Sequence, residues 1–270
     1  MSKALSKTVK RHMKVLCISD NEIYELYEGW NDEEAEKLKD IGLILSAGDL
    51  GAEYLEFLVT MLNVPLLYVR GNHDSCYDEE PPEGCLDIDD KVAEIIIDED
   101  DTADICENVM QGIQGVKVGI SAKASLRKSS RLLRISGLGG SISSGEDYGE
   151  AYPAEDEFTE AEMKARVKKL RWMLKDYSIA DKLLAADAQQ GGSVTPLDIL
   201  LTHSPAFGHG DLPDPTHTGF KCFNEILMDM KPAYHIYGHV HQEYGMITRE
   251  CTHPSGTKEV NVCGMHIIEL

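Results

Sequence analysis

The chain has 270 residues, 42% of them hydrophobic, and a formal net charge of −21 at pH 7. This length and hydrophobic share are typical of an α/β domain with a sizeable buried core. The acidic surface repels phosphate backbones and anionic lipids, which argues against long nucleic acid and membranes as partners. A small anionic substrate is compatible with this charge, because local cations such as bound metals can reverse the field inside one cleft.

The composition predicts a cytoplasmic protein. Its seven cysteines are odd in number and contain no CxxC pair, which favours reduced thiols over a disulfide framework. Residues 1–12 are basic and lack the apolar core of a signal peptide; if Met13 is the true start, they are an N-terminal extension. The longest apolar region, Leu55 to Val69, is interrupted by Asn63 and Pro65 and is too short to span a bilayer.

The first third of the chain alternates buried strands with helices. Short apolar runs predict strands at Lys14–Ser19, Ile41–Ala47 and Leu66–Val69. Between them, Asn31 offers an N-cap for a helix that runs to about Lys39, and Ala52–Leu62 has helical spacing. This order is typical of parallel strands joined by right-handed crossovers.

The middle of the chain is less regular. An acidic run, Asp98–Asp104, predicts a solvated loop, and residues 98–131 predict a variable excursion from the domain, with strand character near Val116–Ile120. A strand is predicted at Leu132–Leu138. A helix that begins with a capping box is predicted at Thr159–Asp176, where apolar residues recur on one face.

The last third of the chain continues the alternation of strands and helices. The predicted elements are strands at Ile199–Leu201, His235–Tyr237, Glu259–Val262 and His266–Glu269 and a helix at Phe220–Asp229. No internal repeat interrupts the pattern, so we expect one α/β domain over residues 1–270.

Metal-competent side chains stand where five of these strands end. They are Asp20 with Glu22, Asp49, Asn72 with His73, His203, and His239 with His241. The carboxyl ends of parallel strands meet at one edge of a sheet, so these side chains are expected to share one site. Carboxylate, amide oxygen and imidazole ligands favour Mn²⁺, Fe²⁺, Zn²⁺ or Mg²⁺, and two such ions can clamp a phosphate and activate a water.

Four short motifs carry this pattern in a fixed order. They are Gly48-Asp49, Gly71-Asn72-His73-Asp74, Thr202-His203 and Gly238-His239-Val240-His241. The set resembles the calcineurin-like metallophosphoesterase superfamily, and the resemblance extends from Asp20 to His241. It implies a four-layer α/β/β/α sandwich of two mixed β-sheets flanked by helices, with two bound divalent metal ions.

The resemblance also implies roles for individual residues. The first metal would be held by Asp20, Glu22, Asp49 and His241, and the second by Asp49, Asn72, His203 and His239, with Asp49 bridging the two ions. A metal-bridging hydroxide would attack the phosphorus of a phosphomonoester or phosphodiester, with His73 as the catalytic proton donor. The sequence does not separate these two ester classes.

One residue departs from the family pattern. The superfamily usually has Asp-x-His in its first motif, whereas this chain has Asp20-Asn21-Glu22. A carboxylate in place of an imidazole adds negative charge, which favours Mn²⁺, the ion we expect, or Mg²⁺ over Zn²⁺. Alternatively, Glu22 points away and the first site binds its metal weakly.

Two other functions compete with a general hydrolase. One is a non-catalytic metal-binding scaffold of the same fold, against which both Asn72 and His73 are present. The other is a specialised protein phosphatase, but the additional arginines with which such enzymes grip phosphate are not found.

The loop Phe207–Gly219, which contains His209 and His217, is either a wall of the cleft or a plain surface loop.

Overall fold

The computed structural model describes residues 13–97, 103–105, 131–143, 156–188, 196–241 and 248–270. The predicted N-terminal extension and the strand character near Val116–Ile120 lie outside these ranges. The first sheet has the strand order β14-β1-β2-β3-β4, and all its strands are parallel except β14, which runs antiparallel to β1. Its strands are β1 (Lys14–Ser19), β2 (Ile41–Ser46), β3 (Leu66–Tyr68), β4 (Leu86–Asp87) and β14 (Gly264–Glu269).

The second sheet has the strand order β12-β13-β11-β10-β7-β5-β6. Strands β13, β11, β10 and β7 are parallel, whereas β12, β5 and β6 each run antiparallel to their neighbours. Its strands are β5 (Val92–Ile97), β6 (Ala103–Ile105), β7 (Arg131–Leu138), β10 (Ile199–Thr202), β11 (Tyr234–Tyr237), β12 (Glu250–Thr252) and β13 (Lys258–Asn261). A small parallel pair, β8 (Ser141–Ile142) and β9 (Glu157–Phe158), follows the end of β7.

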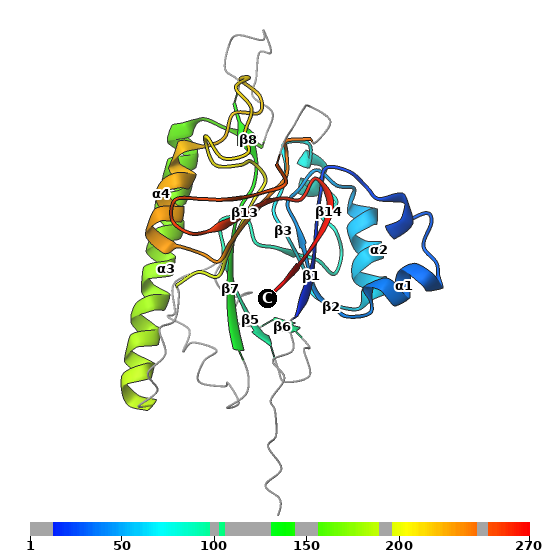
Figure 1. The fold of residues 1–270 in the computed structure, drawn as a ribbon, viewed down its shortest axis with the longest axis horizontal. Coiled ribbons are helices and arrows are strands. Elements are labelled where there is room, and N and C mark those ends of the chain that lie inside the picture. Colours follow the sequence, from blue (N-terminus) through cyan, green and yellow to red (C-terminus); the bar gives the residue numbers. More distant parts are fainter. Residues whose placement is uncertain (1–12, 98–102, 106–130, 144–155, 189–195, 242–247) are drawn as a thin grey trace, which may run out of the picture.

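Helices cover the outer face of each sheet (Figure 1). Helices α1 (Asp32–Leu38) and α2 (Ala52–Leu62) pack on the first sheet, and α3 (Glu160–Ala188) and α4 (Lys221–Met230) pack on the second. Two short 3-10 turns, η1 (Tyr24–Leu26) and η2 (Ser75–Asp78), follow β1 and β3. Within the described ranges, none of the helices combines the length and the apolar character needed to cross a bilayer.

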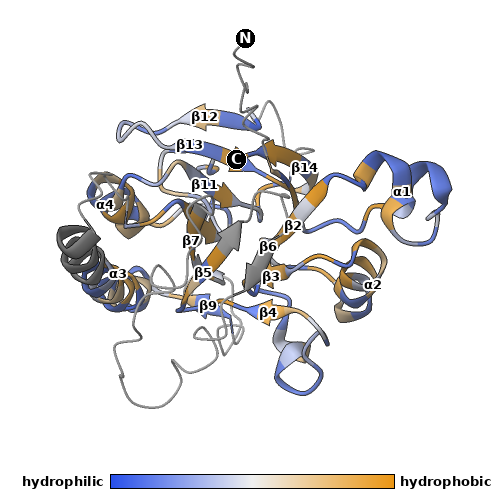
Figure 2. Cartoon of the chain, turned by 90° about the horizontal axis from the view of Figure 1, so that it is seen from below, coloured by the Kyte–Doolittle hydropathy of each residue, from blue (hydrophilic) through white to orange (hydrophobic). Residues whose placement is uncertain are grey.

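Three apolar cores hold the layers together. Between the sheets, Val15 of β1 and Leu45 of β2 belong to the same buried cluster as Ile135 of β7 and Leu201 of β10. A second core lies beneath α3 and α4, and a third beneath α1 and α2. Figure 2 shows hydrophobic residues concentrated in the strands between the two pairs of helices. The predicted four-layer α/β/β/α sandwich of two mixed sheets is confirmed.

The predicted helix starts are also confirmed in their capping contacts. Asn31 Oδ1 accepts the N–H groups of the first turn of α1. At α3, the Glu162 carboxylate accepts the Thr159 N–H at 2.9 Å, and the Thr159 hydroxyl accepts the Glu162 N–H at 3.3 Å. This helix runs on to Ala188, past the predicted end at Asp176.

Strands β4, β5 and β12 are not indicated by the sequence pattern. In β5 the apolar run is broken by Glu94, which is nevertheless buried because its carboxylate lies 2.8 Å from Nε of the buried Arg134. The predicted loop at Asp98–Asp104 is wrong for its last two residues, because Ala103–Ile105 pairs with β5 as the edge strand β6. The rest of that run lies outside the described residues.

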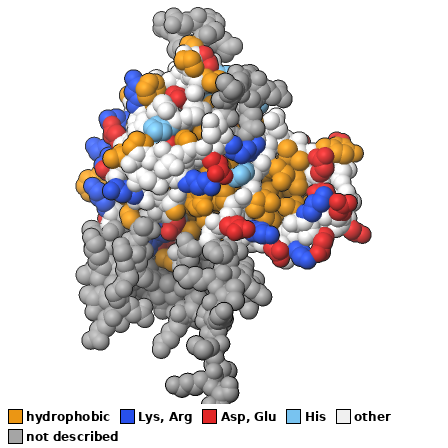
Figure 3. All heavy atoms as spheres, viewed as in Figure 1, with side chains coloured by type: hydrophobic (Ala, Val, Ile, Leu, Met, Phe, Trp, Pro, Cys, Tyr) orange, Lys and Arg blue, Asp and Glu red, His pale blue; other side chains and the backbone are white. Residues whose placement is uncertain are grey.

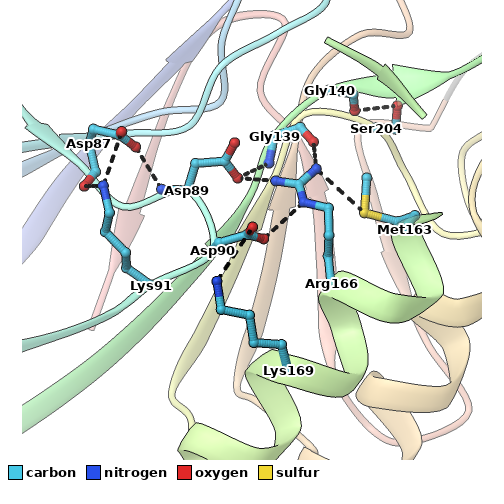
Figure 4. A network of polar contacts seen from close by, with 10 residues as sticks. All are labelled: Asp87, Asp89, Asp90, Lys91, Gly139, Gly140, Met163, Arg166, Lys169 and Ser204. Atoms are coloured by element: carbon cyan, nitrogen blue, oxygen red, sulfur yellow. Dashed lines mark hydrogen bonds and ion pairs between the residues drawn. The ribbon is translucent and has the colours of Figure 1, made fainter. Parts of the chain in front are cut away.

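Arg166 of α3 ties the two sheets together beside the end of β7 (Figure 4). Its guanidinium donates to Asp89 Oδ1 at 2.6 Å, to Asp90 Oδ1 at 2.8 Å and to the Gly139 carbonyl at 2.8 Å. Asp89 and Asp90 belong to the segment that carries the chain from β4 in the first sheet to β5 in the second. Since Asp89 Oδ1 also accepts the Gly139 N–H at 2.6 Å, the ion pair fixes the exit of β7.

Replacing Arg166 by Met should lower the free energy of unfolding by roughly 1–3 kcal/mol, because the largely buried Asp89 carboxylate would lose its charged partner. Lys169→Met is the matched control. The exposed Lys169 amine lies 4.0 Å from Asp90, and surface pairs of this kind contribute about 0–1 kcal/mol. Urea unfolding measures both variants, and equal losses would contradict the role assigned to Arg166.

Candidate metal centre

The carboxyl ends of strands from both sheets meet at one place. Within the first sheet, the Asp20 N–H donates to the Gly48 carbonyl at 3.1 Å. Between the sheets, the Asp20 carboxylate accepts the His239 N–H, at 3.0 Å from each oxygen, and His203 Nδ1 lies 2.7 Å from the Ala47 carbonyl. These contacts join the ends of β1 and β2 to the ends of β10 and β11.

Three residues at this place have left-handed backbone conformations that side chains other than glycine rarely adopt. The φ angle is 63° at Asp20, 57° at Asp49 and 66° at His239. Each such residue costs roughly 1–3 kcal/mol and persists only where the surrounding structure enforces it. The strain coincides with the polar side chains, which is typical of a functional site.

Glycines pack directly against these acidic side chains. A Cβ atom at Gly71 would collide with Asp49 Oδ1, and one at Gly238 would collide with the Asp20 carboxylate. Only glycine leaves room for the carboxylates to turn back over the neighbouring backbone. The glycines of the sequence motifs therefore fix the direction of the two aspartates.

Hydrogen-bond acceptors converge at Asp49, Asn72 and His203. His203 Nε2 lies 3.3 Å from Asp49 Oδ2 and 3.1 Å from Asn72 Oδ1. Because its Nδ1 faces the Ala47 carbonyl, Nδ1 carries a proton and Nε2 is the nitrogen turned toward the site. Ligand atoms of Asp20, Asp49 and His203 all lie within 4.8 Å of one another.

This crowding of acceptors requires a positive charge between them. In the metal-free protein the charge is a proton on His203. Although burial by itself lowers the pKa of His203, the Asp49 carboxylate outweighs burial and raises this pKa to about 9. Burial in turn raises the pKa of Asp49, but His203 overcomes that effect and lowers it to about 2. A divalent cation would satisfy the same acceptors.

His239 is held as a neutral imidazole. Its Nε2 lies 2.9 Å from the Thr216 carbonyl, so Nε2 carries the proton and Nδ1 keeps its lone pair. Burial and the neighbouring His203 ring, 4.9 Å away between centroids, lower the pKa of His239 to about 3. A neutral histidine whose second nitrogen donates to a carbonyl is the form that metal sites use, and His203 has the same arrangement with Ala47.

The loop Phe207–Gly219 forms a wall of this site. It supplies the Thr216 carbonyl to His239, and the His217 ring lies 5.2 Å from the His239 ring between centroids. His217 is itself held by Asp214, whose Oδ1 lies 2.8 Å from His217 Nδ1. Of the two hypotheses for the loop, the cleft wall is therefore the one that the structure supports.

His73 and Asp74 hold Asp49 from the motif that follows β3. Asp74 Oδ2 accepts the N–H groups of Asp49 at 2.8 Å and Gly71 at 2.7 Å, and burial raises the pKa of Asp74 to about 6. The His73 N–H donates to Asp49 Oδ1 at 2.8 Å, while its side chain is exposed. Asn72 Nδ2 lies 3.2 Å from His73 Nε2, which turns the Asn72 amide oxygen toward the site.

His241 and Glu22 lie at the edge of the arrangement. His241 Nε2 is 3.7 Å from Asp20 Oδ1, and 34% of the His241 side chain is exposed. Glu22 Oε1 accepts the Gly51 N–H at 3.1 Å, at the start of α2. Among the described residues, the group formed by Asp20, Asp49 and His203 does not include Glu22, so its role as a ligand stays a prediction.

The model of the calcineurin-like phosphoesterase family matches residues 13–243 of the chain. The chain belongs to the calcineurin-like phosphoesterase family. The family is one of phosphoesterases and typically binds divalent metals. The donor set fits that assignment, because it combines hard carboxylate oxygens with imidazoles that are oriented by carbonyl partners.

Relatives of the chain share only parts of their length with it. UPF0046 protein T07D4.2 of Caenorhabditis elegans is 36% identical over 69 residues, which is 25% of this chain and 16% of that protein. UPF0046 protein C25E10.12 of the same organism is 40% identical over 58 residues, which is 19% of this chain and 21% of that protein. The matches thus cover less than a quarter of either relative.

Solved structures align over nearly the whole chain at low identity. One crystal structure covers 96% of this chain and 95% of its own, with a TM-score of 0.50 and 12% identity. The crystal structure of TT1561 of Thermus thermophilus covers 96% of this chain and 99% of its own, with a TM-score of 0.49 and 13% identity. At such identities a likeness concerns the fold alone.

Sequence patterns identified the charged side chains of the site and missed its backbone partners. The carbonyls of Ala47 and Thr216 set the proton positions of the two buried histidines. A carbonyl is present at every position and leaves no mark in a sequence. The only signal was that Thr216 lies in a long loop directly after a motif strand.

Divalent metal binding should release one proton in the neutral range. His203 holds a proton up to about pH 9, whereas Asp49 and His239 are already deprotonated above about pH 4. The apparent affinity for Mn²⁺ should therefore rise about tenfold per pH unit between about pH 6 and pH 8. Calorimetric titration in buffers of different ionisation enthalpy measures both the affinity and the released proton. An affinity that stays constant over this range would contradict the assignment.

Proposed function

We propose that this protein hydrolyses a phosphate ester of a small substrate with two divalent metal ions bound at the candidate centre. The observation that carries the proposal is the group of Asp20, Asp49 and His203, whose ligand atoms crowd together at the joint end of two sheets. Such a group is stable only around a positive charge. The match to a phosphoesterase family supports hydrolysis of a phosphate ester as the use of this charge.

The two ions are proposed to share Asp49. Asp20, Glu22, Asp49 and His241 would hold the first ion, and Asp49, Asn72, His203 and His239 the second. Mn²⁺ is the proposed ion, because oxygen ligands dominate the first set. When bound, the ions supply an activated water as nucleophile and neutralise the phosphoryl oxygens.

The chain's own contribution is to orient these ligands and to deliver a proton. Asp49 accepts the His73 N–H with one oxygen and faces His203 with the other, so both of its oxygens are directed before any substrate arrives. His73 is exposed beside this carboxylate, where an imidazole N–H can protonate a departing alkoxide or phenoxide oxygen. Its position supports the role of proton donor.

The charge of the protein supports a small substrate and a strict need for metal. Acidic side chains gather at the α1 end of the face in Figure 3, and the chain carries a net charge of −21. Without bound cations the field would repel any phosphate. Bound ions reverse the field only locally, which suits a compact ester better than an extended polyanion.

Hydrolysis of aryl phosphates tests the proposal. Wild-type protein should hydrolyse an aryl monoester or diester with added Mn²⁺, and less with Mg²⁺ or Zn²⁺. His73→Asn should lower kcat by about 10²–10⁴-fold without loss of bound metal, because a proton donor contributes on that scale. The defect should be larger for phenyl phosphate than for p-nitrophenyl phosphate, since the poorer leaving group needs the proton more.

A histidine outside the candidate metal centre serves as the control. His266→Asn changes a histidine of β14 that contacts Glu250, and it should leave turnover unchanged. If His73→Asn lowered kcat equally for both leaving groups, this result would contradict only the role of His73 as proton donor. Wild-type protein that binds metal and turns over neither ester class would support the non-catalytic scaffold instead.

Two substitutions of Glu22 separate a ligand from a helix contact. Glu22→Gln keeps an acceptor for the Gly51 N–H but removes the charge, so it should raise the Mn²⁺ concentration for half-maximal activity by about tenfold or more and leave thermal stability unchanged. Glu22→Ala should show the same metal defect and also lose about 0.5–1.5 kcal/mol of stability, because the Gly51 N–H would lose its acceptor. Equal Mn²⁺ dependence of Glu22→Gln and wild type would show that Glu22 only contacts α2.

A further inference from the structure

A second cluster of metal-binding side chains lies on the outer face of the second sheet. It consists of His209, Cys251 and Glu259, each of which offers one ligand atom, and these atoms all lie within 4.8 Å of one another. Cys251 of β12 and Glu259 of β13 are direct partners across the antiparallel ladder, and His209 comes from the loop Phe207–Gly219. We call these three residues the thiol cluster.

The spacing of the thiol cluster fits a tetrahedral zinc site. Glu259 Oε2 lies 3.0 Å from His209 Nδ1 and 3.5 Å from Cys251 Sγ. With usual zinc bond lengths and tetrahedral angles, ligand atoms are separated by about 3.3 Å for nitrogen and oxygen and about 3.5 Å for sulfur and oxygen. Both distances to Glu259 lie within a few tenths of an ångström of these values, and the ligand atoms of His209 and Cys251 lie within 4.8 Å of each other.

The Glu259 carboxylate is oriented as metal-bound carboxylates are. It is fully buried, and its second oxygen, Oε1, lies 3.0 Å from Nδ1 of the equally buried His235. That contact uses one oxygen and leaves Oε2 directed at His209 and Cys251. A hydrogen bond to the non-coordinating oxygen is the usual outer support of a metal ligand.

A buried hydroxyl without a partner marks the same place. Tyr237 is fully buried, and its hydroxyl has no hydrogen-bond partner among the described residues. The hydroxyl lies against Gly210, the residue after His209, and its pKa is raised by burial and by ionisable groups that include Cys251 and Glu259. Buried hydroxyls are normally paired, so this one indicates a missing polar ligand at the thiol cluster.

We propose that His209, Cys251 and Glu259 bind a zinc ion, separate from the candidate metal centre. The thiolate selects zinc over manganese and magnesium, which prefer oxygen. Three protein ligands leave a fourth position for a solvent molecule, which the Tyr237 hydroxyl can bond. Both nitrogens of the adjacent His253 are already engaged, with Ser255 and Asn224, so it packs against His209 without acting as a ligand.

The zinc ion would stabilise the loop that contacts the candidate metal centre. It would fasten the loop Phe207–Gly219 to the β12–β13 hairpin through His209. The same loop presents the Thr216 carbonyl that sets the proton position of His239. The thiol cluster therefore supports the ligand geometry from outside without contacting the substrate.

Cobalt substitution tests the proposal. The full-length protein is freed of metal with a chelator and titrated with Co²⁺ alone. A cobalt–thiolate bond gives a charge-transfer band in the near ultraviolet, which the candidate metal centre cannot give because its predicted ligands include no thiol. The band should appear in wild type and in the control Cys76→Ser, which changes an exposed thiol, and it should be absent in Cys251→Ser.

Zinc titration gives a second, independent measurement. Wild type should bind one more equivalent of Zn²⁺ than His209→Asn, and this variant keeps the proposal testable if Cys251→Ser does not fold. Asp49→Asn should keep the cobalt–thiolate band, because it alters only the candidate metal centre. A wild-type protein without the band, or a Cys251→Ser protein with an undiminished band, would overturn the zinc site.

Discussion

The structure depends on two carboxylates that meet at the junction of its sheets. Asp20 and Asp49 are compensated there by a proton on the buried His203 and by backbone N–H groups, and His241 Nε2 lies 3.7 Å from Asp20 Oδ1. Both sheets contribute to this group, so whatever positive charge fills it also attaches one sheet to the other. The same group of side chains therefore belongs both to the candidate metal centre and to the junction between the sheets.

Packing elsewhere in the fold offsets the unfavourable backbone conformations of this site. Left-handed backbone at Asp20, Asp49 and His239, together with glycines that no other residue can replace, makes the strand ends unfavourable on their own. The apolar core between the sheets and the ion pair of Arg166 offset that cost away from the site. Stability and reactivity are therefore placed in different residues, which lets the site keep its strained geometry.

Much of this could be predicted from the sequence, for definite reasons. Buried parallel strands appear as apolar runs, and the motif residues follow them directly, as at Asp49 and His203. Strand β5 was not predicted because Glu94 interrupts its apolar run. In the structure the buried Glu94 carboxylate pairs with Arg134, and this pairing is visible only in three dimensions. The thiol cluster was not predicted because its residues lie on a loop and two strands, and their spacing in the sequence matches no metal-binding motif. Backbone partners such as the Thr216 carbonyl have no sequence signal beyond the position of the loop that contains them.

The pairing of β14 with β1 determines when the site can form. Strand β1 ends at the residue before Asp20, and one of its two neighbours, β14, is built from residues at the opposite end of the sequence. During synthesis, β1 therefore keeps an open edge until residues 264–269 have left the ribosome. The contact that completes the first sheet has the longest sequence separation in the fold, which makes it slow to form. Asp20 thus gains its final surroundings only after residues 264–269 have been synthesised.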